Sequence, residues 1–229
     1  MSSGETPPVD DGDGDGDGGG GVRDGGGDGG TGRIPARHDV VAPFDIAENA
    51  RRLGHLRWFE DAMFAVTGSW VADASDPELR QMFGVASHLH AEHAERLAAR
   101  LPELREMSPD DLTVPAHPAL SRLVDDLAAI TDDAERLAAL GRVVVPALVV
   151  AYRCHLDRTS AVTDASTVRL TRHALDDLVE LWQRSQVASS WMLLTDSDVE
   201  WIAARLTPLD RALVESGGVC GAHSSAVST

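Results

Sequence analysis

Four polar side chains share the apolar faces of three predicted helices and could carry the chemistry of this protein. His90 and His93 are three residues apart, so one helical turn places both on the face that carries the apolar residues of their helix. Glu60 and Asp177 lie in the same way on two other apolar faces. Burial of an unpaired carboxylate or imidazole is costly, so we expect these groups to find partners. Two imidazoles beside carboxylates could act as general acid and base, or could bind a metal ion.

The elements that must position these groups are helical. Apolar residues recur at spacings of three and four along most of the chain, and no segment shows the alternation typical of a strand. The pattern predicts four long helices, over 45–72, from 76 to before Pro102, over 132–158 with a bend at Pro146, and over 164–194. A long connection over 102–131 contains a short helix at 118–130, and one or two short helices follow, at 198–206 and 208–215. The fold class is therefore all-α.

Composition divides the chain into three parts. Residues 1–33 hold 14 of the 21 Gly and eight acidic residues, and we predict a disordered tail over 1–40. A helical domain is expected over 41–216 and a flexible tail over 217–229. The formal net charge of −17 argues against binding to nucleic acid or to anionic membranes.

Other function classes are excluded by what the sequence lacks. All 20 basic residues are Arg, so there is no P-loop or Schiff-base lysine. Two Cys give neither a disulfide framework nor a zinc knuckle. No secretory signal is visible, and the longest apolar run, 143–151, is interrupted by Pro146 and too short to span a bilayer. We therefore expect a soluble, cytoplasmic protein.

Residues 45–195 resemble a known family. The stretches that carry the resemblance are LGHLRWFE at 53–60, HAEHAERL at 90–97, VPALVVAYRCH at 145–155 and DASTVRL at 164–170. They are similar to ferritin-like proteins of the rubrerythrin and di-iron-oxidase type. The resemblance implies a four-helix bundle with a long connection between helices 2 and 3 and, here, short extra C-terminal helices.

This sequence departs from the metal site that the resemblance implies. The family uses one Glu on helices 1 and 3 and a Glu-x-x-His motif on helices 2 and 4. Glu60 and His93 match this pattern. The other four positions are occupied by His90, Val150, Leu178 and Leu181. A one-turn slip in the register of helix 4 would bring in Asp177 or His173. Since aliphatic residues replace bridging carboxylates, we do not expect a di-iron centre.

The favoured interpretation is an enzyme that needs no cofactor. His90 and His93 would act as general acid and base, with Glu60 orienting an imidazole and Asp177 as a further catalytic group. The substrate would be a small organic molecule, and the reaction a cyclisation, isomerisation or elimination in specialised metabolism. The predicted pocket residues are Trp58, Val150, Tyr152, Leu178, Leu181 and Trp182.

Two alternatives stay open. A mononuclear iron or zinc enzyme would use Glu60, His90, His93 and Asp177 as ligands. A non-catalytic bundle would use the same residues only as polar pairs, in the core or at a dimer face. A homodimer is compatible with the sequence. His155, at the end of the third predicted helix, is expected to be solvated.

Overall fold

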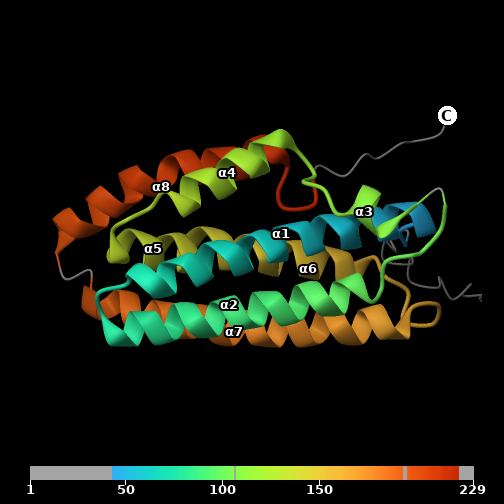
Figure 1. The fold of residues 1–229 in the computed structure, drawn as a ribbon, viewed down its shortest axis with the longest axis horizontal. Helices are drawn as coiled ribbons and strands as arrows, with labels where there is room; N and C mark the ends of the chain where they lie inside the picture. The colour runs from blue at the N-terminus through green and yellow to red at the C-terminus, as the bar shows by residue number, and fades with distance from the viewer. Residues whose placement is uncertain (1–42, 106, 193–194, 222–229) are drawn as a thin grey trace, which may run out of the picture. The chain divides into compact units, whose positions relative to one another are not determined.

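The part of the chain described by the computed structural model is helical. It comprises residues 43–105, 107–192 and 195–221 (Figure 1). Within these residues the one β-type pairing is an isolated bridge between Leu104 and Met107. The all-α prediction is therefore confirmed. The predicted disordered tail over 1–40 lies outside the described residues.

Four long helical segments lie side by side and enclose the core (Figure 1). The segments are α1 (Ile46–Asp73), α2 (Pro77–Ala98), the run of α5 (Asp133–Ala139), η1 (Leu140–Val144) and α6 (Val145–Asp157), and α7 (Ala165–Met192). Local sequence explains two of the helix starts. The side chain of Asp45 accepts the backbone N–H of Glu48, and Asp76 caps α2, which begins with Pro77. All four long helices predicted from the sequence are present.

The long connection between α2 and α5 contains helices of its own. α3 (Pro109–Leu112) is a single turn, and α4 (Pro118–Ala128) packs against α8 (Asp196–Ser216). Figure 1 shows α4 and α8 together on one side of α1 and α5. One face of α4 is fully buried and carries Leu120, Leu123 and Leu127. The connection is thus a packed layer above the four long segments.

Of the one or two short C-terminal helices that the sequence predicts, the structure has a single longer one, because α8 continues through Pro208. Ile202, Leu206 and Leu209 are all buried on one side of α8, on both sides of the proline. A Thr195–Asp198 capping box also stabilises the start of this helix. Packing of a continuous apolar face therefore outweighs the hydrogen bond that Pro208 cannot donate.

The third long segment, for which a bend at Pro146 is predicted, contains a π-helical turn shortly before this proline. The N–H of Val145 bonds to the carbonyl of Leu140, five residues earlier, and the π-helical η1 ends just before Pro146. By length and composition, the whole segment Asp133–Asp157 could cross a membrane. However, 61% of its most apolar window is buried inside the protein, which is the burial expected of a core helix.

The described part of the predicted C-terminal tail is packed against the domain. Gly217 ends α8 in the left-handed conformation, with φ of 72°. Val219 and Cys220 are then buried. Residues 222–229 lie outside the described residues.

Candidate functional site

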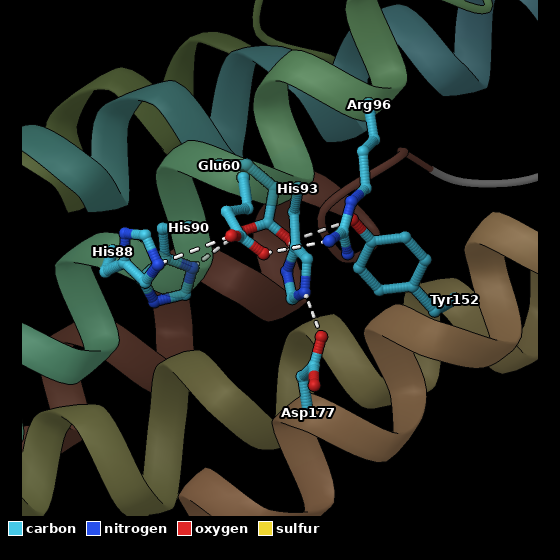
Figure 2. A network of polar contacts seen from close by, with 8 residues as sticks. Glu60, His88, His90, His93, Arg96, Tyr152 and Asp177 are labelled. Carbon is cyan, nitrogen blue, oxygen red and sulfur yellow. Dashed lines mark hydrogen bonds and ion pairs between the residues drawn. The ribbon is translucent and has the colours of Figure 1, made fainter.

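The four long segments bring five polar side chains together in the core (Figure 2). Glu60 comes from α1, His90 and His93 from α2, Tyr152 from α6 and Asp177 from α7. Glu60, His90 and His93 are at most 1% exposed, whereas the side chain of Asp177 is 30% exposed. The cluster is therefore buried, with Asp177 as its member nearest to solvent.

The carboxylate of Glu60 is the centre of the cluster. Its Oε2 lies 2.5 Å from Nδ1 of His90, and its Oε1 lies 3.2 Å from Nδ1 of His93. The hydroxyl of Tyr152 donates to the same Oε1 at 2.7 Å. On the far side of its ring, Nε2 of His93 lies 3.1 Å from Oδ2 of Asp177. Both ring nitrogens of His93 therefore face carboxylates (Figure 2).

The neighbours of each group determine its charge. Burial opposes ionisation of Glu60, but the charge of His90 and hydrogen bonds from both histidines lower the pKa of Glu60 to about 2. Burial also opposes charge on His93, yet contacts with Glu60 and Asp177 raise its pKa above the usual value. Burial, reinforced by Glu60, raises the pKa of Tyr152 far above its ordinary value. At neutral pH Glu60 is ionised and Tyr152 is a hydrogen-bond donor.

The cluster has the composition and spacing of a metal site. Glu60, His90 and His93 each offer a ligand atom, and these atoms all lie within 4.8 Å of one another. Ligands bound at about 2.0–2.1 Å to one ion lie roughly 3.0–3.4 Å apart. The 3.2 Å between Nδ1 of His93 and Oε1 of Glu60 falls in this range, whereas the 2.5 Å between Nδ1 of His90 and Oε2 of Glu60 is a direct hydrogen bond that an ion would have to replace. Asp177 contacts the far nitrogen of His93, as carboxylates do for metal-bound histidines. With one carboxylate and two imidazoles, these three residues offer ligands for a single ion.

His90 contains one unusual atom. Its Nε2 is buried and has no hydrogen-bond partner. By contrast, His88 on the same helix is 71% exposed and pairs with Glu92, which also binds Arg96 (Figure 2). The structure thus separates the inward His90 and His93 from the solvated face of α2, as the helical spacing predicts.

Only some of the predicted pocket residues are buried in the core. Leu178 and Leu181 are buried in the core, and Trp58 is partly buried against it. Trp182 is 43% exposed, and Val150 is 67% exposed. The structure therefore does not place Val150 and Trp182 at a shared pocket with the cluster.

The rotation of α6 about its axis explains why Val150 is exposed although the sequence predicts it in the pocket. Tyr152 faces the cluster, and positions two residues apart on a helix lie on nearly opposite sides. Val150, the third-helix ligand position that the resemblance implies, therefore points away from the cluster. Tyr152 is the residue of α6 whose side chain reaches Glu60. Leu148, one turn before Tyr152, is buried on the same face.

The surface pockets lie away from the cluster. Five pockets in the described part of the chain have volumes of about 280–450 Å³, and none of these five is lined by Glu60, His90 or His93. One of them, between α2 and α7, is lined by Leu181 together with Met82 and Trp191. These pockets do not include the elongated cavity that a substrate beside the histidines would need.

His155 is a buried histidine, contrary to the expectation that it is solvated. His155 is 0% exposed, although its place near the end of α6 suggested solvent contact. It lies three residues after Tyr152, and this spacing is the signal that could have placed it on the inward face.

Comparison of the chain with protein-family models, with curated proteins and with solved structures finds no match.

Proposed function

We propose that this protein is a ferritin-like helical bundle that binds one divalent transition-metal ion at Glu60, His90 and His93. The observation that carries the proposal is the proximity of these three buried side chains from two helices, whose ligand atoms all lie within 4.8 Å of one another. The arrangement of four long segments with a long connection between α2 and α5 supports the ferritin-like part of the proposal. Two imidazoles and one carboxylate suit iron(II) or zinc.

The remaining residues of the cluster would orient the ligands. Asp177 holds Nε2 of His93 in hydrogen-bonding distance and so fixes the orientation of the ring. The hydroxyl of Tyr152 restrains the carboxylate of Glu60. A bound ion would supply Lewis-acid or redox chemistry.

A cofactor-independent acid/base enzyme is the second candidate. The buried, unpartnered Nε2 of His90 favours it, because such a nitrogen could exchange a proton with a substrate. A substrate would have to contact this atom, and none of the five pockets above reaches His90. The geometry therefore supports the metal site better.

Metal analysis of matched variants tests the proposal. We expect metal-stripped protein, incubated with Zn(II) or anaerobically with Fe(II) and then desalted, to retain about one ion per chain. His93→Ala should lose this ion, because it removes a ligand. His88→Ala should retain it, since His88 is exposed on the same helix. Circular dichroism of both variants checks that they remain helical.

A second variant examines the role of Asp177. Asp177→Asn should weaken the affinity for the ion by about 10- to 100-fold without abolishing binding. Failure of the wild-type chain to retain zinc or iron would overturn the metal proposal and favour the acid/base candidate. Two ions per chain would also contradict it.

A further inference from the structure

The third long segment exposes a single stripe of side chains on the side away from the core. Within residues 140–157 the exposed residues are Arg142, Val150, Arg153 and Asp157. Their spacings of eight, three and four residues place them on one face of a helix, and together they form the outer stripe. Val150 is 67% exposed, whereas Tyr152, which contacts Glu60, is fully buried. The outer stripe therefore faces away from the metal cluster.

Apolar side chains surround Val150 in the outer stripe. Pro146, one turn before Val150, is partly buried. Trp182 on α7 adds a ring that is 43% exposed. This ring borders the third segment, because Gln186, one turn later on α7, donates to the carbonyl of Gly141. An exposed apolar surface with charged residues at its ends indicates an interaction surface.

The charged residues of the outer stripe have no partners within the described part of the chain. Arg142, Arg153 and Asp157 make neither an ion pair nor a side-chain hydrogen bond with any described residue. By contrast, the exposed Arg96 and Arg184 each pair with a glutamate of their own helix. Arg142 and Asp157 are fifteen residues apart, or about 22 Å along the axis, and cannot reach each other. Their opposite charges are therefore available to another molecule.

We propose that the outer stripe is the contact face of a homodimer, in which α6 packs antiparallel to α6 of a second copy. A two-fold axis between Val149 and Val150 would place Arg142 of each copy opposite Asp157 of the other, because both residues are equally far from this point. Two symmetric ion pairs would then close the two ends of an apolar contact. The stripe is thus complementary to itself, which favours a second copy over an unrelated partner.

Arg153 is also accommodated by this arrangement. It would lie opposite Pro146 of the second copy, where its methylene stem covers the proline ring and its charged end stays in water. It is one turn before Asp157 on its own helix, so this carboxylate faces two arginines. The two copies of Arg153 would be seven residues apart, or about 10 Å along the axis, where salt screens their repulsion.

The dimer goes beyond the proposed metal site and is independent of it. The outer stripe contains no residue of the metal cluster and lies on the opposite side of α6 from Tyr152. Dimerisation should therefore be equal in metal-stripped and metal-loaded protein. A stripe about 22 Å long gives a contact near the lower end of the size range of specific interfaces. We therefore expect a dimer that dissociates on dilution.

Sedimentation equilibrium of the 229-residue chain measures the dissociation constant of the dimer. Val150→Asp should raise this constant at least tenfold, because it places two carboxylates next to each other at the two-fold axis. The matched control is Val187→Asp on α7. Val187 is 61% exposed and lies about 140° around the helix from Trp182, so this variant should dimerise as the wild type does. Circular dichroism checks that both variants remain helical.

Charge reversal tests the antiparallel pairing itself. Arg142→Asp and Asp157→Arg each replace two attractive pairs by two repulsive ones, and each should raise the dissociation constant about tenfold. A mixture of these two single variants should form a heterodimer in which both pairs are restored. The double variant Arg142→Asp/Asp157→Arg should dimerise as the wild type does.

Several outcomes would overturn the dimer. One is a wild-type chain that stays monomeric at every concentration, and another is a dimer that Val150→Asp leaves unchanged. Failure of the mixed single variants to associate more tightly than either variant alone would also overturn the pairing. A monomeric chain that co-sediments with phosphatidylglycerol vesicles would assign the outer stripe to a membrane surface and would equally contradict the proposal. Loss of metal binding with an intact dimer would contradict only the metal site.

Discussion

His93 and His155 are both buried, yet their pKa values move in opposite directions. His93 lies between the carboxylates of Glu60 and Asp177, which outweigh burial and raise its pKa. His155 has a guanidinium beside it and no hydrogen-bond partner, so burial lowers its pKa to about 4. At the scale of single residues, neighbouring charge and burial together decide which histidine is ionised.

The lowered pKa of His155 predicts a pH dependence of stability. In the unfolded chain an imidazole binds a proton below about pH 6.5, whereas folded His155 does so only near pH 4. Stability from this group is thus complete above pH 6.5 and is lost as the pH falls towards 4. Between pH 7 and pH 5 the wild type should lose about 2 kcal/mol more than His155→Leu.

Urea unfolding at both pH values measures this difference. The matched control is His173→Leu, because His173 is exposed on α7. It should show the same pH dependence as the wild type. Identical behaviour of His155→Leu and the wild type would show that His155 is not buried in its neutral form.

At the scale of elements, one close contact holds the connection onto α1. A Cβ atom placed on Gly54 would lie 2.2 Å from the carbonyl oxygen of Leu112, which is backbone and cannot rotate away. The glycine in this helix is therefore explained by the close approach of α3. The helical pattern around Gly54 predicts α1, but it contains no sign of this neighbour.

The contact predicts opposite effects for two Gly→Ala changes. Gly54→Ala should destabilise the protein by about 1–3 kcal/mol, because α3 must move away. Gly84→Ala on α2 should be neutral or stabilise by up to about 1 kcal/mol, since its nearest neighbour is 4.0 Å from the new Cβ and alanine favours helix. Thermal unfolding of both variants checks this, and similar melting temperatures would contradict the α1–α3 packing.

At the scale of the whole helical domain, α4 and α8 form a layer over the four long segments (Figure 1). One polar contact joins this layer to α5. Nε of Arg205 on α8 lies 3.1 Å from both carboxylate oxygens of Glu135, whose side chain is 7% exposed. This contact neutralises an otherwise buried negative charge and complements the apolar packing of Ile202 and Leu206.

Removal of this contact should loosen α8 selectively. Arg205→Gln should cost about 1 kcal/mol, because Glu135 stays nearly buried without a cationic partner and the exposed arginine is partly screened. Amide hydrogen exchange should become faster in α8 and remain unchanged in α1 and α2. Arg211→Gln, also on α8, is the control and should leave exchange unaltered. Uniform acceleration in all helices would contradict the two-layer description.

The sequence by itself determined the four long helices and the inward positions of Glu60, His90 and His93. Helical periodicity predicts which residues share a face of a helix. Because burial of an unpaired charge is costly, polar residues on an apolar face are expected to pair with one another in the core. The starts of α1 and α2 could also be predicted from the sequence, because the capping residues Asp45 and Asp76 and the first-turn Pro77 depend only on the neighbouring backbone.

Only the tertiary structure decided which partners meet. The rotation of α6 selects Tyr152 over Val150 as the contact of Glu60, and it buries His155 beside Arg52. Likewise, α8 continues through Pro208 because its apolar face is covered by helices far away in the chain. These outcomes depend on packing between distant segments, and the local pattern of residues does not contain that information.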